Sequence, residues 1–263
     1  MQDSPTAALK AKKGSSIAIG LQMVREGRAH AFVSAGNTGA VFSASTLILG
    51  RLDGIGRPTI GALLPSAQSP CFLVDAGANV DCRASHLYEF GLMGSIYITT
   101  MFGKESPRVG LVNVGEEESK GNEVSQEAYR LLKSSSLNFI GNVEGRDILK
   151  GVADVAVCDG FVGNIVLKFG ESVPGFLKAK FKAYADGNIV RSVIGLIARN
   201  GLRAVMKEMD YQEHGGVPIL GVRGVSIIGH GSSTPKAMKN MILRADEMAR
   251  RGVNTKIQAA LRG

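Results

Sequence analysis

Short apolar runs alternate with longer stretches of helical periodicity along the first 160 residues. The short runs are flanked by glycine or other turn residues and predict β-strands at 31–34, 59–64, 71–74, 108–114, 139–140 and 155–158. The longer stretches predict helices over 6–27, with a break near 13–15, and over 40–51, 84–102 and 124–134. Strands that alternate with helices in this way are typical of an α/β fold with a doubly wound, mostly parallel sheet flanked by helices.

The pattern changes after residue 160. Residues 165–207 carry few strand signals and predict two helices joined near 186–188, which we expect to form a projecting helix pair over 172–208. Residues 218–228 are strand-like again, and 235–251 follow Ser232-Ser233-Thr234 as a capped final helix. Because no internal repeat or low-complexity linker divides the sequence, we expect residues 1–263 to form a single α/β unit.

Composition and charge narrow the possibilities. The 263 residues are 44% hydrophobic, which excludes a disordered chain, a coiled coil and a disulfide-stapled miniprotein. The formal net charge is +8, and residues 172–207 contain seven basic side chains against one acidic side chain. A local basic element of this kind either faces solvent or binds something acidic, such as anionic lipid headgroups, an acidic protein or nucleic acid.

The cysteines, the histidines and the start of the chain add further limits. Cys71, Cys82 and Cys158 never form a C-x-x-C pair, and the four histidines show no H-E-x-x-H spacing, so we expect no disulfide framework, metal or other cofactor. Asp3 stands where a signal peptide would need basic and then apolar residues, and no window approaches 18 uninterrupted apolar residues. The sequence therefore predicts a cytoplasmic protein that does not span a membrane.

Four loops that follow predicted strands carry the candidate chemistry. In an open parallel sheet, ligands bind beyond the carboxyl ends of the strands, where the loops 34–40, 75–81, 115–122 and 159–164 are expected to lie. Each loop alone is compatible with a simple turn, but four together predict an anion-binding cleft. They match neither G-x-G-x-x-G nor G-x-x-x-x-G-K-[ST], which argues against a standard dinucleotide fold, including that of a dehydrogenase, and against a P-loop.

Two groups within this set leave alternatives open. The three consecutive acids Glu116, Glu117 and Glu118 could bind a divalent ion, but their side chains diverge and Lys120 adds competing charge, so an ion pair of Lys120 with Glu117 or Glu118 is the simpler interpretation. His230 lies between an apolar strand and a helix start. It could face the cleft or could cap a carbonyl group as a structural histidine.

At these loops the sequence resembles the bacterial PlsX family, the phosphate acyltransferases of phospholipid synthesis. The resemblance rests on long strings in the same order, which are SAGNTGA (34–40), DAGANVDC (75–82), RVGLVNVGEEE (108–118), KGNE (120–123), FIGNVEGRD (139–147), CDGFVGN (158–164) and HGSS (230–233). It implies transfer of a long-chain acyl group from acyl carrier protein to inorganic phosphate. It further implies a homodimer with a fold similar to phosphotransacetylases and the isocitrate dehydrogenase group. The family's N-terminal strands and Asp-Ala-Met-Gly-Gly-Asp loop are absent from this chain.

The chemistry implied by the resemblance asks mainly for positioning and charge control, because phosphate is already anionic and a thiolate is a good leaving group. We assign catalytic roles to Lys120, Asn122 and His230, with Lys120 stabilising phosphate or the oxyanion. The expected phosphate- and substrate-binding residues are Gly36, Asn37, Thr38, Asp75, Asn79, Asp81, Asn142, Arg146, Asp159, Gly163 and Asn164. Among them, the backbones of Asn37-Thr38 and Gly163-Asn164 are expected to cradle the anion.

The basic helix pair is expected to contact the carrier protein and the membrane. Acyl carrier protein is acidic in general, and the expected contacts are Lys178, Lys180, Lys182, Arg199 and Arg203. The second helix begins with the apolar Ile189 and Val190 among basic residues, a pattern that predicts peripheral association with an anionic membrane surface. Its apolar stripe could instead pack on the partner helix or on a second subunit.

Two other functions stay open at this stage. One is a phosphotransacetylase-like transfer of short acyl groups from coenzyme A to phosphate. The other is a non-catalytic scaffold that binds membrane or acidic protein through the basic helices. Nucleic acid is not an expected partner, because the charge outside the helix pair is nearly balanced.

Overall fold

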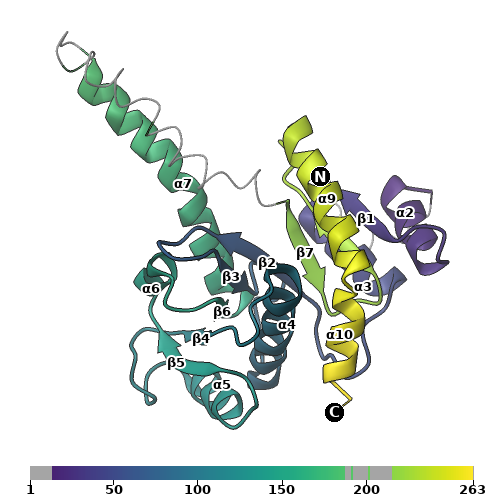
Figure 1. The fold of residues 1–263 in the computed structure, drawn as a ribbon, viewed down its shortest axis with the longest axis horizontal. Helices are drawn as coiled ribbons and strands as arrows, with labels where there is room; N and C mark the ends of the chain where they lie inside the picture. Colours follow the sequence, from purple (N-terminus) through teal and green to yellow (C-terminus); the bar gives the residue numbers. More distant parts are fainter. Residues whose placement is uncertain (1–13, 187–190, 192–200, 202–214, 263) are drawn as a thin grey trace.

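A computed structural model describes residues 14–186, 191, 201 and 215–262 (Figure 1). The described residues form an eight-stranded sheet in the order β1-β8-β7-β2-β3-β6-β4-β5. Its strands are β1 (Ala31–Ser34), β2 (Thr59–Leu64), β3 (Cys71–Val74), β4 (Val109–Val112), β5 (Phe139–Val143), β6 (Val155–Val157), β7 (Val217–Leu220) and β8 (Val225–Ile228). The expected α/β class is confirmed.

The strand directions reverse in the middle of the sheet. β1 runs parallel to β8, and β3, β6, β4 and β5 run parallel to one another. Between these groups, β8 with β7, β7 with β2, and β2 with β3 are antiparallel pairs. Four of the seven pairings are therefore parallel, and β1 points opposite to β3. Strand direction depends on pairing between distant segments, which local hydrophobic pattern does not encode.

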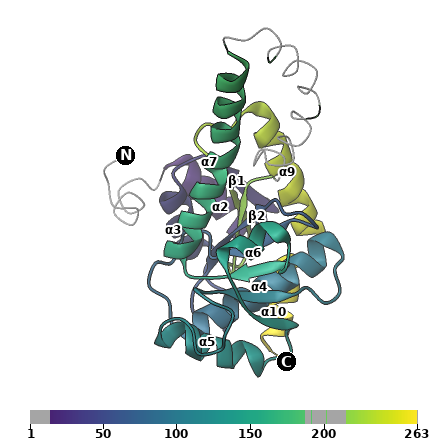
Figure 2. The same ribbon diagram turned by 90° about the vertical axis from the view of Figure 1, so that its left-hand side faces the viewer.

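Helices cover both faces of the sheet (Figures 1 and 2). They are α2 (Ser16–Arg25), α3 (Thr38–Ile48), α4 (Ala84–Phe102), α5 (Glu123–Lys133), α6 (Gly145–Lys150), α7 (Gly160–Ala185), α9 (Pro235–Arg250) and α10 (Val253–Ala260). Side chains of α4, α5, α9 and α10 share one buried cluster, and α2, α3, α6 and α7 contribute to the clusters of the opposite face.

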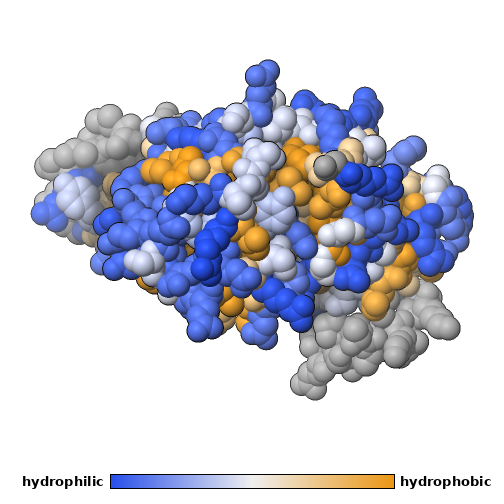
Figure 3. Space-filling view, turned by 90° about the horizontal axis from the view of Figure 1, so that it is seen from below, coloured by the Kyte–Doolittle hydropathy of each residue, from blue (hydrophilic) through white to orange (hydrophobic). Residues whose placement is uncertain are grey.

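Strand β3 shows why its apolar run is continuous. Phe72 and Val74 join the cluster that contains α4, whereas Leu73 joins the cluster that contains α6 and α7. Successive side chains of a strand point to opposite faces, so a strand covered on both sides needs apolar residues at every position. On the outer surface shown in Figure 3, apolar patches are interrupted by hydrophilic side chains.

Helix α7 extends away from the sheet at its C-terminal half (Figures 1 and 2). It continues through Pro174 and ends at Ala185, with Asp186 as its C-cap, near the predicted junction of the helix pair. The second helix of that predicted pair lies outside the described residues. No helix in the described ranges is long and apolar enough to cross a membrane.

Candidate active site

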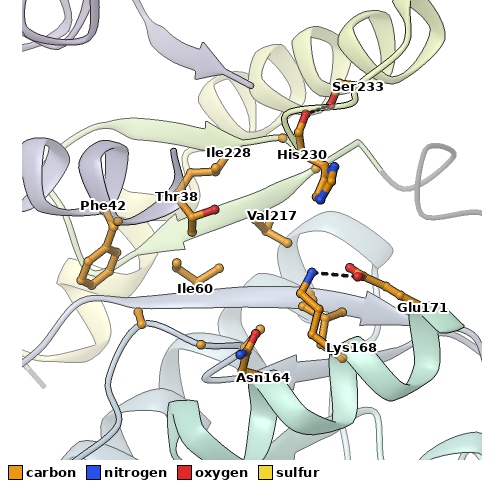
Figure 4. A pocket seen from close by; sticks show the side chains of 18 of the residues that line it. Thr38, Phe42, Ile60, Asn164, Lys168, Glu171, Val217, Ile228, His230 and Ser233 are labelled. Carbon is orange, nitrogen blue, oxygen red and sulfur yellow. Dashed lines mark hydrogen bonds and ion pairs between the residues drawn. The ribbon is translucent and has the colours of Figure 1, made fainter. Parts of the chain in front are cut away.

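A cavity of about 550 Å³ lies where the two strand directions of the sheet meet. Its walls come from the start of α3, strand β2, the loop after β3, one face of α7, the start of β7 and the loop between β8 and α9 (Figure 4). Three of the four predicted loops reach it, namely 34–40, 75–81 and 159–164. The first of them follows β1, which runs opposite to β3 and β6, so these loops do not share one edge of the sheet as expected.

Helix α3 forms one wall. The Asn37 side chain caps this helix by accepting a hydrogen bond from the Ala40 N–H at 3.0 Å, and the Ser34 hydroxyl accepts from the Gly36 N–H at 3.1 Å. Gly36 and Asn37 thus build the turn, while Thr38 and Phe42, one helical turn apart, point into the cavity (Figure 4).

The buried carboxylate of Asp75 holds the loop after β3 in place. Asp75 accepts hydrogen bonds from the N–H groups of Gly77 and Ala78 at 3.0 Å and of Asn79 at 2.7 Å. The Asn79 amide donates both to Asp75 and to the Pro58 carbonyl, at 2.8 Å each. Burial raises the pKa of Asp75, and the hydrogen bonds it accepts partly oppose this rise. Asp75 and Asn79 therefore shape a loop whose Ala76, Gly77 and Ala78 line the cavity.

Helix α7 packs tightly on that loop. Asp159 caps the helix by accepting from the Val162 N–H at 2.8 Å, and the Gly163 N–H donates to the Asp159 carbonyl at 2.9 Å. The structure thus gives the Gly163 N–H a partner other than the predicted anion. A methyl group on Gly163 would lie 1.8 Å from the carbonyl oxygen of Asp75, so only glycine allows this approach. The close packing places Asn164 beside Gly77 on the cavity wall.

The loop after β8 supplies His230 and Ser233 from the opposite side (Figure 4). His230 Nδ1 accepts the Ser232 N–H at 3.2 Å and lies 2.6 Å from the Ser232 hydroxyl. In the neutral ring the proton is then on Nε2, which makes this nitrogen a hydrogen-bond donor. Of the two interpretations of His230, the structure favours a side chain that faces the cavity.

The loop 115–122 is the predicted loop that does not line the cavity. Lys120 Nζ lies 3.8 Å from Glu117 Oε1, and the Asn122 side chain caps α5 by accepting from the Ser125 N–H at 2.9 Å. The Asn142 amide donates to the Glu117 carbonyl at 2.8 Å, and its Oδ1 is buried without a hydrogen-bond partner among the described residues. These residues form a second polar group at the carboxyl ends of β4 and β5, on the same edge as the loops after β3 and β6.

The remaining predicted residues lie outside the cavity. Arg146 pairs with Glu144 at 2.8 Å, and the Asp81 side chain is exposed beyond the 75–79 loop. Lys178, Lys180 and Lys182 are exposed on the projecting end of α7. Ile189, Val190, Arg199 and Arg203 lie outside the described residues.

The cavity is apolar in its depth and polar at its rim. Its apolar lining includes Phe42, Ile60, Leu63, Leu167, Val217, Ile228 and Met241. Thr38, Asn164, Lys168, Glu171, His230 and Ser233 supply the polar groups, and Lys168 pairs with Glu171 at 2.8 Å. In the part of the chain that the structure describes, no three His, Cys, Asp or Glu side chains are grouped so that they could hold a metal ion.

The cysteines near the site are unsuited to act as nucleophiles. Burial raises the pKa of Cys82 to about 12, helped by the negative charges of Asp75 and Asp159. Burial likewise raises the pKa of Cys158, whose thiol faces the Asp75 carbonyl. A thiol is nucleophilic as its thiolate, so the raised pKa values leave these two cysteines poor nucleophiles.

Sequence reasoning missed Phe42, Lys168 and Glu171. The signal was helical spacing: Phe42 is four residues after Thr38, and Lys168 and Glu171 are four and seven residues after Asn164. Residues so spaced share a helix face. The start of α7 was predicted at 165 instead of 160, which hid this relation.

Comparison with known proteins identifies the family of the chain and agrees with its fold. The model of a family described as "Fatty acid synthesis protein" matches residues 1–256. The phosphate acyltransferase of Pelotomaculum thermopropionicum is 50% identical over 247 residues, which are 94% of this chain and 72% of that protein. The phosphate acyltransferase of Heliobacterium modesticaldum is 49% identical over 261 residues, 99% of this chain and 77% of that protein.

A solved structure shares the fold at low sequence identity. The EutD phosphotransacetylase from Staphylococcus aureus superposes with a TM-score of 0.60 at 14% identity, and the match covers 93% of this chain and 74% of that one.

Proposed function

The chain belongs to the fatty acid synthesis protein family, the PlsX family of phosphate acyltransferases, and from this premise we propose that it transfers a long-chain acyl group from acyl carrier protein to inorganic phosphate. The chain is thus a transferase that makes an acyl phosphate for phospholipid synthesis. We propose that its residues act as one acyltransferase unit.

One observation carries this proposal. The cavity combines an apolar interior with a rim of hydrogen-bond donors that come from α3, α7 and the loop after β8. An acyl phosphate has the same two parts, a hydrocarbon chain and a dianionic head. The apolar residues Phe42, Ile60 and Met241 suit the chain, and Thr38, Asn164 and His230 suit the head.

The reaction needs no external acid or base. A phosphate oxygen attacks the thioester carbonyl carbon and forms the new C–O bond, and the negative charge moves onto the carbonyl oxygen. Collapse of this tetrahedral intermediate breaks the C–S bond, and the sulfur leaves as a thiolate that takes the proton of hydrogen phosphate. Holding the two reactants in attack geometry supplies about 7 kcal/mol or more of the barrier reduction.

We propose that the residues at the rim of the cavity stabilise the negative charge that develops on the carbonyl oxygen. His230, Asn164 and Thr38 carry hydrogen-bond donors and line facing walls of the cavity (Figure 4). Each well-placed donor to an oxyanion contributes about 10²-fold to 10³-fold in rate. We propose that Lys120, Asn122 and Asn142 of the second polar group, together with Arg146, approach the thioester from the edge after β4.

The projecting helix suits a large acidic donor. Lys178, Lys180 and Lys182 crowd three positive charges onto the end of α7. Opposite charge speeds the encounter of two proteins and orients them. The acyl carrier protein would dock there, with its thioester reaching into the cavity along α7.

We further propose that the protein works as a homodimer at the cytoplasmic surface of an anionic membrane. The side chains of Phe161, Ile165 and Phe169 form an exposed apolar stripe at a spacing of four residues on α7, with exposed fractions of 58%, 53% and 72%. An apolar stripe of this kind suits a second copy of the helix.

Delivery of a lipid product to a membrane enzyme favours association with the membrane surface. This supports the predicted membrane contact through Ile189 and Val190.

The test is an assay of the purified chain with two acyl donors. Acyl phosphate is trapped with hydroxylamine and the released thiol is counted, with palmitoyl-acyl carrier protein or acetyl-coenzyme A as donor and phosphate present or omitted. We expect phosphate-dependent product from the carrier thioester at a kcat/KM far above that of acetyl-coenzyme A. Preference for acetyl-coenzyme A would assign a phosphotransacetylase, and no product from either donor would support the scaffold alternative.

A further inference from the structure

The face of α7 that lines the cavity carries an ion pair that the reaction as described leaves unused. Asn164, Lys168 and Glu171 follow one another at helical spacing, and all three line the cavity. Lys168 Nζ lies 2.8 Å from Glu171 Oε2. Among the described residues that line the cavity, Lys168 is the one lysine or arginine and Glu171 the one carboxylate.

We propose that Lys168 binds the phosphate substrate and that Glu171 is a positioning residue, which holds the ammonium group at the cavity wall until phosphate arrives. This inference rests on the proposed function. It adds two residues to the predicted site. Lys168 contacts phosphate, and Glu171 is a negative charge that positions the Lys168 ammonium group.

The geometry supports phosphate as the ligand of Lys168. Figure 4 shows Lys168 and Glu171 on α7 and His230 on the opposite side, and all three line the same cavity. A phosphate held there would meet the ammonium group from one wall and the imidazole from the other. Hydrogen phosphate carries nearly two negative charges, which a cavity with apolar walls could not hold without a cation.

The strength of the ion pair suits an exchange of partners. The Lys168 side chain is 53% exposed and that of Glu171 is 31% exposed, so water screens the pair and the attraction is weak. A phosphate dianion offers more negative charge and several acceptor oxygens, so it competes well for the ammonium group. Glu171 then stays within reach as a negative charge, which would repel phosphate whenever Lys168 is missing.

Repulsion between Glu171 and phosphate in the absence of Lys168 distinguishes a phosphate-binding ion pair from one that only stabilises the helix. Lys168→Met leaves Glu171 uncompensated beside the phosphate and should raise the KM for phosphate by about tenfold or more, with the KM for the acyl donor unchanged. Lys168→Arg keeps the charge and should recover most of the affinity. The double variant Lys168→Met/Glu171→Gln should bind phosphate better than Lys168→Met alone, because the repelling charge is gone.

A matched control lies elsewhere in the same chain. Lys150 and Asp147 on α6 form a lysine–carboxylate pair with the same 2.8 Å distance and the same three-residue separation, away from the cavity lining. Lys150→Met should leave the KM for phosphate at the wild-type value. Thermal unfolding of every variant shows which ones are folded.

The experiment measures phosphate in two ways. Initial rates with varied phosphate give KM and kcat, and equilibrium dialysis with radiolabelled inorganic phosphate gives a dissociation constant that needs no turnover. A raised KM and dissociation constant in Lys168→Met, with recovery in the other two variants, supports the proposal. Wild-type values in Lys168→Met, or a double variant weaker than the single one, would overturn it. If the wild-type protein makes no acyl phosphate, the proposed function fails, while dialysis still decides whether Lys168 binds phosphate.

Discussion

Gly163 lies at the crossing of α7 and the loop after β3, with room for a hydrogen atom and nothing larger. Gly163→Ala would push a methyl group against the Asp75 carbonyl, so we expect a loss of about 1–3 kcal/mol in the free energy of unfolding. The helix would shift and carry Asn164 and Lys168 away from the facing wall. Chemical denaturation and the acyl phosphate assay measure the two effects.

Gly175, three turns further along the same helix, provides the control for that substitution. A methyl group there meets nothing within 4 Å. Gly175→Ala should therefore stabilise the protein by about 0.5–1 kcal/mol, because alanine has the better helix propensity. If both variants changed stability alike, the close approach at Gly163 would not matter.

Lys120 is one of two predicted catalytic residues, with Asn122, that the structure places outside the cavity lining. Its side chain is about half exposed and its pairing with Glu117 at 3.8 Å is weak, so Lys120→Ala should leave the unfolding temperature nearly unchanged. If Lys120 stabilises the oxyanion from the second polar group, turnover falls by about 10²-fold. Steady-state rates for Lys120→Ala with saturating substrates decide the point, and wild-type turnover would remove Lys120 from the mechanism.

The loops of the site could be predicted from sequence better than the roles of their residues. The strings around Asn37, Asp75 and Asp159 mark the right turns, because caps and glycines leave a local signature. The same residues prove to hold backbone N–H groups of their own loops. Which helix face reaches the cavity depends on how the two strand directions meet, and the only local sign for Lys168 is its helical spacing from Asn164.

Among the secondary-structure elements, strands β4 and β6 are joined at their starts by a buried carboxylate. Asp154 is 1% exposed and accepts hydrogen bonds from Lys104 Nζ at 2.6 Å and from the Arg108 N–H at 2.7 Å. Burial alone would raise the pKa of Asp154, but the bonds from Arg108 and Lys104 outweigh it and lower the pKa below 3.8.

A stability difference that depends on pH follows from this lowered pKa. Because the folded state holds the ionised form more strongly, the stabilisation is complete above the unfolded pKa and is lost as the pH falls through the folded pKa. We expect Asp154→Asn to lower the free energy of unfolding by about 3 kcal/mol at pH 7. The difference in the free energy of unfolding between the wild-type protein and the variant should decrease below pH 3.8. Urea titrations at several pH values test this, and a gap independent of pH would contradict it.

Most elements could be predicted from sequence because their periodicity is local. The helix over Ala84–Phe102 and the strands Thr59–Leu64 and Cys71–Val74 begin and end where the pattern predicts. The short helices α6 and α10 were not predicted, since one or two turns give too few apolar positions to show a period. The antiparallel placement of β2 and β7 was also not predicted, because their pairing joins residues some 160 positions apart.

At the scale of the whole molecule, the apolar stripe on α7 predicts self-association. Phe169→Asp places a charge on the most exposed residue of the stripe, so we expect the dissociation constant of the dimer to rise by at least about tenfold. Ile19→Asp, at a similarly exposed apolar position on α2, should leave the association unchanged. Sedimentation equilibrium over a range of concentrations measures both. A monomeric wild-type protein would refute the proposed homodimer.

The ladder between β2 and β7 has a consequence for the way the molecule opens. Only Thr59 and Ile60 of β2 pair with β7, whereas four residues of β2 pair with β3. This ladder of two residue pairs is the shortest among the described strands, and the cavity lies along it. We infer that the sheet opens locally at this ladder first. The parts of the sheet on either side should therefore separate first at the β2–β7 ladder. Amide protons of this ladder should exchange with deuterium sooner than those of β3 or β6. A ligand that contacts α3 on one side of this ladder and α7 on the other would bridge the two parts of the sheet. Saturation with such a ligand should slow amide hydrogen exchange at the ladder.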